Sequence, residues 1–386
     1  MGAYQPLHHQ HSQKPSSTHH GRVVLAWLFS AVLCLALLHL ICCSPRAARE
    51  NVIVSPLLQY ITSAYIEEGS TSSGCDYSEG QWVRAAGHAR RYNGTECNVK
   101  DSENCVRNGR PDTGYLDWRW QPAAPGCQLP GFDAAAFLGA PGTRKFWRWA
   151  FPTHNVTVSV YWAPFLARAT GRCDNYSLPY NSVHLDALAD RWSADAGTMD
   201  VAVVSTGHWF WNPSVYYNGG EVLGTHLLPE LNHTGIGFLS PYREAIRASI
   251  RRLASAGRAR AVVVATFSPA HFEKAWDDPA TCARRLPYTE GEREVDATHA
   301  ELRSIVREET TAAAARDGGA TRVEVLDVTK LATMRPDGHP GVYMKRDPFA
   351  RGVPERLQSD CLHFCLPGPV DTFNEILLQL LLAKRE

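Results

Sequence analysis

The residues with the clearest chemical potential lie near the carboxyl terminus. Asp360 and His363 are three positions apart and are flanked by Cys361 and Cys365. A carboxylate that orients an imidazole on one short loop supplies two members of a hydrolase-type triad. The third member, an activated serine, is absent from its usual contexts, because the chain has no Gly-Asp-Ser turn and no Gly-x-Ser-x-Gly elbow.

The composition sets the broad class of protein. The chain has 386 residues, a formal net charge of +0 and 44% hydrophobic residues. This is enough for one large domain or two modest domains, each with an apolar core. The balanced charge argues against a nucleic-acid-binding protein, which usually carries a basic excess.

The amino-terminal part contains a long apolar run. Residues 23–43 carry no Asp, Glu, Lys or Arg, and a helix of this length can cross the hydrocarbon core of about 30 Å. A cleaved signal peptide is the alternative, but its apolar region is usually shorter. We expect an uncleaved signal anchor at 23–43, a cytosolic tail at 1–22 and a lumenal stem at 44–74.

Two features support a lumenal location for the remainder. Acceptor motifs for N-glycosylation occur at Asn93, Asn155, Asn175 and Asn232. An even number of cysteines beyond the span predicts disulfides in an oxidising compartment. Spacing alone leaves the pairing open among Cys75, Cys97, Cys105, Cys127, Cys173, Cys282, Cys361 and Cys365.

The pattern of apolar residues predicts two regions beyond the stem. Residues 75–138 are rich in Cys and Trp and show little periodicity, so we expect a loop-rich subdomain held by disulfides. Residues 139–386 alternate strand and helix signals, which indicates βαβ units and a doubly wound α/β sheet. The strands are expected at 155–162, 199–205, 259–266 and 322–328, and the helices at 241–256, 295–317 and 371–383, with Asp371 as N-cap.

Several ordered blocks resemble a known family. They are CDYSEGQWV (75–83), NCVRNGRPD (104–112), YLDWRWQP (115–122), TGHWF (206–210), TFSPAHF (266–272) and DCLHFCLPG (360–368). Together they resemble the plant trichome birefringence-like, or PC-esterase, family. The resemblance implies Golgi type II membrane proteins that acetylate cell-wall polysaccharides, with a catalytic domain similar to GDSL/SGNH hydrolases.

The resemblance also assigns roles and locates a gap. Asp360 matches the family's aspartate and His363 its histidine, whereas no residue matches the serine. Between Leu138 and Trp147 a strand-plus-helix unit of about 30 residues is missing, together with an oxyanion-hole donor. The chain is then an incomplete gene model or splice form, a member that no longer catalyses, or a variant with a replacement nucleophile, for which Ser205 is the candidate.

The family pattern further implies three disulfides. They are Cys75–Cys127, Cys105–Cys365 and Cys282–Cys361, and the last two would clamp the loop that carries Asp360 and His363. The usual partner of Cys97 lies in the missing segment, so Cys97 is left free or pairs with Cys173.

Other polar and aromatic residues have two interpretations each. His208 and Trp209 follow a strand, so they line an acceptor groove or pack in the interior. His271 also follows a strand and is either catalytic or structural. A structural cluster is favoured over donor binding for Arg110, Asp112, Trp118 and Arg119.

The sequence therefore predicts a hemicellulose O-acetyltransferase that takes a polysaccharide acceptor and an acetyl donor, with no metal or other cofactor. The blocks TGHWF, NPSVYYNGG and TFSPAHFE resemble the xyloglucan branch, and xylan and mannan remain alternatives. A catalytically silent polysaccharide binder or partner protein and an acetyl esterase are the competing functions.

Overall fold

A computed structural model describes residues 75–85, 99–129, 146–152, 155–278, 280–316, 320–352 and 356–383. All of them belong to one compact unit, Tyr60–Glu386. The expected membrane span and stem, Cys97, Asn93 and the site of the missing segment lie outside these residues. Within the described ranges, no helix has the length and hydropathy needed to cross a membrane.

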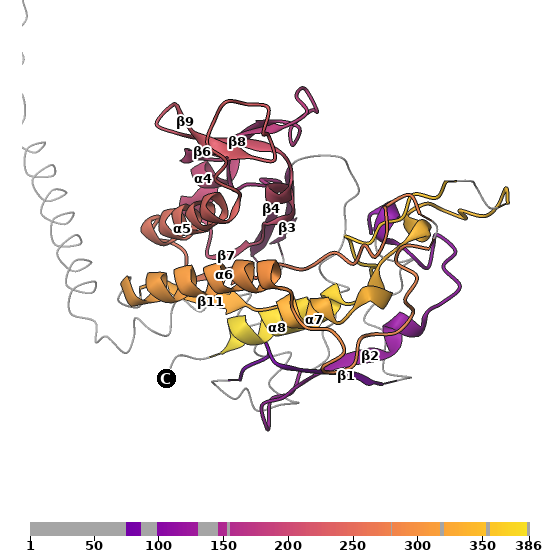
Figure 1. The fold of residues 1–386 in the computed structure, drawn as a ribbon. Coiled ribbons are helices and arrows are strands. Elements are labelled where there is room, and N and C mark those ends of the chain that lie inside the picture. Colours follow the sequence, from indigo (N-terminus) through magenta and orange to yellow (C-terminus); the bar gives the residue numbers. More distant parts are fainter. Residues whose placement is uncertain are drawn as a thin grey trace, which may run out of the picture. The chain divides into compact units, whose positions relative to one another are not determined.

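The centre of the fold is a parallel sheet built from three apolar runs (Figure 1). Strands β7 (Val201–Val204), β10 (Ala261–Ala265) and β11 (Arg322–Leu326) pair in the order β11-β10-β7. Each run is short and rich in valine, which suits a strand that is buried on both faces. The sequence predicted these three strands correctly.

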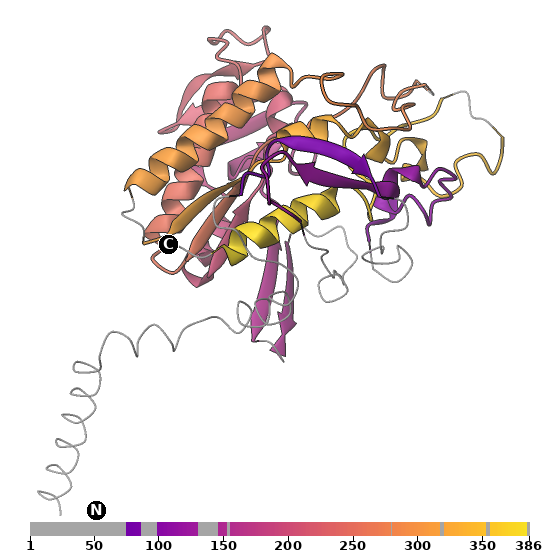
Figure 2. The same cartoon turned by 90° about the horizontal axis from the view of Figure 1, so that it is seen from below.

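Helices cover both faces of this sheet (Figure 2). Val262 and Val264 of β10 pack in the cluster that contains α5 (Leu239–Ser255) and α6 (Ala297–Arg316). Val263 faces the other way and packs with Ile376 of α8 (Val370–Leu382). Successive strand residues point to opposite faces, so the three predicted helices are present and cover both faces of this sheet. The two crossover helices α5 and α6 pack in the same cluster, so the described strands advance in one direction and the doubly wound arrangement stays a prediction.

A second sheet was not predicted. It contains β5 (Ala167–Gly171), β6 (Asn181–Leu188), β8 (Ser214–Asn218) and β9 (Glu221–His226) in the order β5-β6-β8-β9. The connection from β8 to β9 is Gly219-Gly220, and both glycines have positive φ. A Gly-Gly pair between two strands is a hairpin signal that the sequence offered.

The predicted strand at 155–162 is present as β4 (Val156–Tyr161). It pairs antiparallel with β3 (Phe146–Phe151), whose register runs from Phe146 opposite Tyr161 to Phe151 opposite Val156. Two short helices complete the set of α-helices in the described residues, α4 (Asp190–Asp195) and α7 (Thr329–Thr333). Single 3₁₀ turns lie at Asp101–Glu103, Gly114–Asp117, Ala196–Thr198, His208–Trp211, Pro336–Gly338 and Val342–Met344.

The amino-terminal subdomain is more ordered than the sequence suggested. Strands β1 (Gly80–Arg84) and β2 (Trp118–Pro122) form an antiparallel pair. Trp82 and Trp120 meet edge to face at 5.6 Å between ring centroids, and the Trp82 indole N–H donates to the Leu331 carbonyl at 3.0 Å. These tryptophans therefore attach the subdomain to the core through packing.

The structure contains the three disulfides that the resemblance implied: Cys75–Cys127, Cys105–Cys365 and Cys282–Cys361. The first lies within the amino-terminal subdomain. The second joins this subdomain to the carboxyl-terminal loop. Cys173 is buried.

Strand β7 lies at one edge of the parallel sheet. Among the described residues, no strand pairs with its outer edge, and Val203 is 47% exposed. An apolar strand of a parallel sheet normally has neighbours on both sides or a cover over its edge. Among the described residues β11 likewise has no strand on its outer side, so β7 and β11 are the two edge strands of this sheet.

Candidate active site

The predicted couple is formed on a tight loop. The Oδ2 atom of Asp360 lies 2.7 Å from Nδ1 of His363. The other carboxylate oxygen accepts the backbone N–H groups of Leu362 and His363, each at 2.9 Å. Asp360 in turn exchanges two backbone hydrogen bonds with Gly341, at 2.9 and 3.0 Å. Oδ1 of Asp360 thus holds the backbone of the loop, and Oδ2 fixes the orientation of the His363 imidazole.

The two members of the couple differ in exposure. The Asp360 side chain is 9% exposed, whereas that of His363 is 48% exposed. No described residue forms a hydrogen bond with Nε2 of His363, so this nitrogen is open to a reacting group. A buried carboxylate behind a half-exposed imidazole is the arrangement of a triad base and its orienting acid.

The electrostatics of the couple agree with these roles. The hydrogen bond and charge of Asp360 raise the pKa of His363, against the opposing effect of burial. Burial alone would raise the pKa of Asp360, but hydrogen bonds from His363 and Leu362 outweigh burial and the pKa is lowered. Asp360 is consequently a carboxylate at neutral pH, and His363 is a stronger base than a free histidine.

The loop is held on both sides by disulfides. Cys361 and Cys365 are each 0% exposed and join the loop to Cys282 and Cys105. The intervening residues, including His363, are therefore anchored to the segments that carry Cys282 and Cys105. Preorganisation of this kind is what a proton-transfer group requires.

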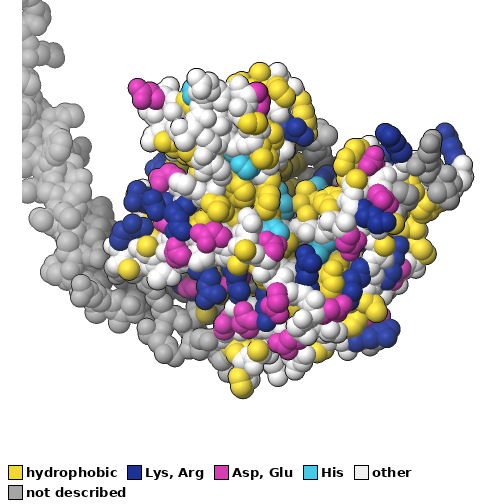
Figure 3. Space-filling view, viewed as in Figure 1, with side chains coloured by type: hydrophobic (Ala, Val, Ile, Leu, Met, Phe, Trp, Pro, Cys, Tyr) yellow, Lys and Arg dark blue, Asp and Glu magenta, His cyan; other side chains and the backbone are white. Residues whose placement is uncertain are grey.

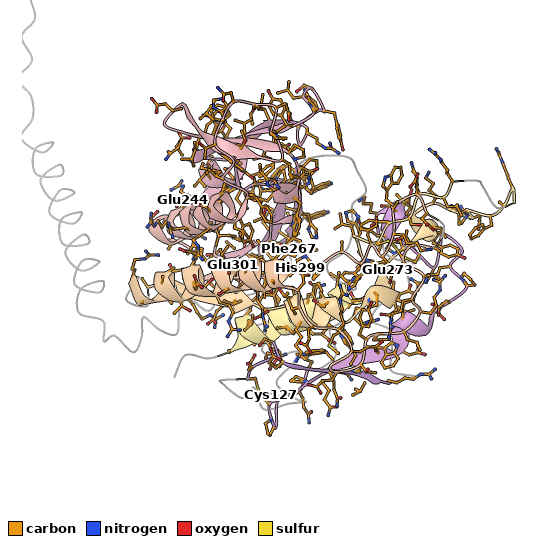
Figure 4. All side chains as sticks on the ribbon, in the orientation of Figure 1. Cys127, Glu244, Phe267, Glu273, His299 and Glu301 are labelled. Atoms are coloured by element: carbon orange, nitrogen blue, oxygen red, sulfur yellow. A yellow bond between two sulfur atoms is a disulfide. The ribbon has the colours of Figure 1, made fainter. Side chains whose placement is uncertain are left out.

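Aromatic and histidine side chains gather around Phe267, which follows β10. His208 lies 4.5 Å from the Phe267 ring and His299 stacks on that ring at 5.0 Å, both measured between centroids. Figure 3 shows hydrophobic and histidine side chains together at the centre of this face, and Figure 4 places Phe267 beside His299. The charge of His363 contributes to lowering the pKa of His208, after the larger effect of burial.

His208 belongs to this cluster as a neutral, hydrogen-bonded ring. Its Nε2 atom lies 2.8 Å from the Ser268 carbonyl. Burial lowers its pKa to about 4, so the ring is neutral at physiological pH. Trp209 packs edge to face with Trp162 at 6.3 Å. The structure thus favours packing for His208, while Trp162 remains 48% exposed beside Trp209.

Gly207 of the TGHWF block packs so closely against a neighbouring ring that a side chain would not fit there. Gly207 has φ +150°, and a Cβ there would lie 2.4 Å from Cδ2 of Phe267. No other residue type fits this contact without moving the ring. The block therefore brings the backbone after β7 against the ring that follows β10.

Other predicted residues are not brought to the couple. Ser205 is exposed at the carboxyl end of β7, and no hydrogen bond joins it to His363. Arg110 is 4% exposed and pairs with Asp112 at 3.1 Å. Its other N–H groups donate to the carbonyls of His339 and Asp337 at 2.8 and 2.7 Å, so it is a structural anchor of the carboxyl-terminal region.

The remaining pair in that predicted cluster is also structural. The Arg119 guanidinium donates to the Leu129 carbonyl at 2.5 Å, and Trp118 packs against the apolar cluster under β10. Neither side chain contacts the Asp360–His363 couple in the hydrogen bonds of the described residues. In this part of the chain, no cluster of three or more Cys, His, Asp or Glu side chains could hold a metal ion.

The sequence did not single out His339, which contacts the loop that carries Asp360 and His363. His271 and His339 are 8% and 3% exposed, and their Nδ1 and Nε2 atoms are 2.7 Å apart. The Nδ1 atom of His339 lies 2.7 Å from the carbonyl of His363. Burial lowers the pKa of both rings, that of His339 to about 3. His271 is therefore not catalytic by contact but belongs to the support of the loop.

Comparison with known proteins identifies the class. A family model described as "GDSL/SGNH-like Acyl-Esterase family found in Pmr5 and Cas1p" matches residues 129–380, and the PMR5 N terminal Domain matches residues 73–128. A parallel sheet with an Asp-His couple on a carboxyl-terminal loop fits this class. The chain belongs to the PC-esterase family.

Three individual proteins of this family illustrate the similarity. Xyloglucan O-acetyltransferase 1 of Arabidopsis thaliana is 44% identical over 346 positions that cover 80% of each protein. Xyloglucan O-acetyltransferase 1 of Populus trichocarpa is 42% identical, covering 80% of this chain and 81% of its own length. Protein trichome birefringence-like 25 of Arabidopsis thaliana is 32% identical, covering 83% and 79% respectively. The chain is similar to all three.

The couple makes stability depend on pH in a defined direction. The pKa of His363 is raised above 6.5. Its contribution to the free energy of unfolding is therefore complete below pH 6.5 and is lost as pH rises through the folded-state pKa. The pKa of Asp360 is lowered below 3.8, so its contribution is complete above that pH and is lost as pH falls. We expect the unfolding free energy of the wild type to exceed that of His363→Gln most between pH 3.8 and 6.5.

Urea unfolding of both proteins between pH 3.5 and 9 measures this difference. The exposed His233→Gln is the matched control, which should show no comparable maximum. A difference that stayed constant, or that grew between pH 6.5 and 9, would contradict the ion pair.

Proposed function

We propose that this protein is an O-acetyltransferase that acetylates a cell-wall hemicellulose, with xyloglucan as the acceptor. The observation that carries the proposal is the Asp360–His363 couple, whose Nε2 atom is open while Nδ1 is held by the carboxylate. The similarity to xyloglucan O-acetyltransferases supports the acceptor. Catalysis belongs to a form of the protein that carries the serine segment.

In that form the couple performs acyl transfer. His363 accepts the serine proton through Nε2 as the serine oxygen attacks the acetyl carbonyl of the donor, and then returns a proton to the leaving group. The acetyl-serine is then attacked by a sugar hydroxyl, whose proton passes to the same nitrogen. The bond between the acetyl carbon and the serine oxygen breaks, and the imidazolium returns this proton to the serine oxygen. Asp360 stabilises the imidazolium in both halves of the cycle and stays ionised.

Two observations support a missing segment, and the resemblance to the family is what assigns it to residues 138–147. The outer edge of β7 has no strand partner among the described residues. The alignment with the Arabidopsis xyloglucan O-acetyltransferase spans 346 positions but uses only 80% of the 386 residues, so it contains gaps in this chain. An incomplete gene model or a splice form remains our first interpretation.

A second candidate function is a catalytically silent polysaccharide binder or partner protein. Exposed aromatic side chains favour it, because sugar rings stack on such surfaces. Trp162 and Trp211 are 48% and 39% exposed, and Trp211 lies 6.3 Å from Phe267. The same residues would hold the acceptor in the active form, so binding and transfer share one surface.

The expected setting is the Golgi lumen. The apolar run at 23–43 would anchor the protein as a single-pass type II membrane protein. Asn155, Asn175 and Asn232 are exposed, as glycosylation requires. Mass spectrometry of the secreted domain and protease protection of Golgi vesicles test these proposals.

The transfer reaction is tested by comparing acceptors. A form with the serine segment is incubated with an activated acetyl donor and xyloglucan, xylan or mannan oligosaccharides, and acetate release into water is measured in parallel. Acetylated xyloglucan as the main product supports the proposal. Water as the sole acceptor would make the protein an esterase, and xylan or mannan as the preferred acceptor would correct the substrate.

Sequencing the transcript and the genomic DNA between the codons for Leu138 and Trp147 settles the form. A coding Gly-Asp-Ser segment supports the transferase. Its absence from both supports the silent binder.

A further inference from the structure

Two buried histidines form a hydrogen-bonded chain that ends on the backbone of the catalytic loop. The Nε2 atom of His271 lies 2.8 Å from the Thr333 carbonyl. Its Nδ1 atom lies 2.7 Å from Nε2 of His339. The Nδ1 atom of His339 then lies 2.7 Å from the carbonyl of His363. All three distances are in the range of normal hydrogen bonds.

These three hydrogen bonds need more protons than two neutral imidazole rings carry. A carbonyl can only accept, so the ring nitrogen at each end must carry a proton. The contact between the two rings needs one further proton on one of the two nitrogens. Three hydrogen bonds therefore need three N–H groups, whereas two neutral imidazoles supply two.

We propose that His271 and His339 are positioning residues for the Asp360–His363 couple, and that they make all three hydrogen bonds only after the pair has taken up one additional proton. The neutral pair makes two of the three bonds. The inference rests on the proposed role of the couple in catalysis.

The connections to the loop make the pair effective in this role. His339 is bonded to the carbonyl of His363 itself, and its ring stacks on Phe364 at 4.5 Å between centroids. The backbone N–H of His271 donates to the Cys361 carbonyl at 2.9 Å. The pair therefore contacts the loop at three residues on either side of and at the proposed base: Cys361, His363 and Phe364.

Some charged and titratable groups around the pair favour a positive charge on its rings, and others oppose it. Asp337 favours a charge on His271, and Asp360 favours a charge on His339. Arg335 is paired with Asp337 at 2.9 Å, which weakens the help from that carboxylate. The other groups that face the pair are Arg110, Tyr288, Arg293, His299 and His363.

Burial and the surrounding cations oppose the charge, whereas two carbonyl acceptors and a neutral imidazole acceptor favour it. The pKa of His271 is lowered, so the additional proton binds as pH falls below the ordinary histidine range. A second additional proton would place two charges on adjacent rings, consistent with the lower pKa of His339. The third hydrogen bond thus forms on acidification.

The wild-type full chain, labelled with ¹⁵N at histidine, tests the proton count by NMR between pH 4.5 and 8. We expect the four ring nitrogens of His271 and His339 to shift in one shared step, and the amides of His363 and Phe364 to follow with the same midpoint. Separate steps for the two rings, or no step in either ring before unfolding, would overturn the proposal. This measurement does not depend on transfer activity.

The positioning role is tested by His339→Phe, which keeps the stack on Phe364 and removes both ring hydrogen bonds. We expect the pKa of His363 to fall towards the ordinary histidine value, because its contact with Asp360 is no longer fixed. His339→Gln should restore the raised pKa, since its amide N–H can donate to the His363 carbonyl. An unchanged pKa of His363 in a folded His339→Phe protein would overturn the role, and the exposed His233→Phe is the control.

Discussion

The 386-residue chain is expected to transfer acetyl groups to xyloglucan with a kcat on the order of 10⁶-fold below that of a relative with an intact triad. The Asp360–His363 couple is formed, but no hydrogen bond joins His363 to a serine in the described residues. A base without a nucleophile cannot form the acetyl-enzyme. Loss of an oxyanion-hole donor alone would cost about 100- to 1000-fold.

A chimera tests whether the missing segment causes the expected loss of activity. The segment of the Arabidopsis xyloglucan O-acetyltransferase that corresponds to the missing unit is inserted between Leu138 and Trp147. The resemblance to the family predicts a strand, a Gly-Asp-Ser turn and a helix in this segment. Transfer to a xyloglucan oligosaccharide is then measured by mass spectrometry. We expect activity to appear in the chimera. The matched control carries alanine in place of the inserted serine. Normal transfer by the unmodified chain would refute the proposed mechanism, and Ser205→Ala would then test the replacement nucleophile.

The second large effect is expected for His363→Ala in the active form. Loss of the base should lower kcat by a factor on the order of 10⁶ while secretion and disulfide formation stay normal. The side chain is half exposed, so its removal leaves no large internal cavity. Continued transfer by this variant would show that another group is the base.

Asp360→Asn separates orientation from proton transfer. The amide keeps the shape of the carboxylate but favours the wrong imidazole tautomer, which lowers kcat by about 10⁴-fold in a comparable triad. The backbone N–H groups of Leu362 and His363 still find an oxygen acceptor in the amide. A larger loss than that of His363→Ala would indicate that the loop has collapsed rather than lost its orienting charge.

The parallel sheet and its helices were predictable because their signals are local. Continuous valine runs such as Ala261–Ala265 occur in buried parallel strands, and the helices between them fix the topology. The Asp360–His363 couple was predictable for the same reason, since both residues lie on one short loop. Its environment, with a carboxylate that accepts three hydrogen bonds, follows directly from that spacing.

The parts that escaped prediction depend on contacts between distant segments. The chain from Thr333 through His271 and His339 to His363 joins three segments that are far apart in sequence. The strands of the second sheet have mixed composition, and only Gly219-Gly220 marked a hairpin there. The β1–β2 pair was missed because Trp82 and Trp120 are 38 positions apart and the intervening residues are irregular.

The disulfides Cys75–Cys127 and Cys105–Cys365 differ in how far apart their cysteines lie in the sequence, which has a consequence for biosynthesis. Cys105 must find a partner 260 positions further along, which takes roughly 10 to 50 s of translation. Cys127, the partner of Cys75 over 52 positions, is synthesised much sooner after its partner. An early bond between Cys105 and Cys127 would leave Cys365 without its partner, and the loop that carries Asp360 and His363 would then lack one of its two disulfide anchors.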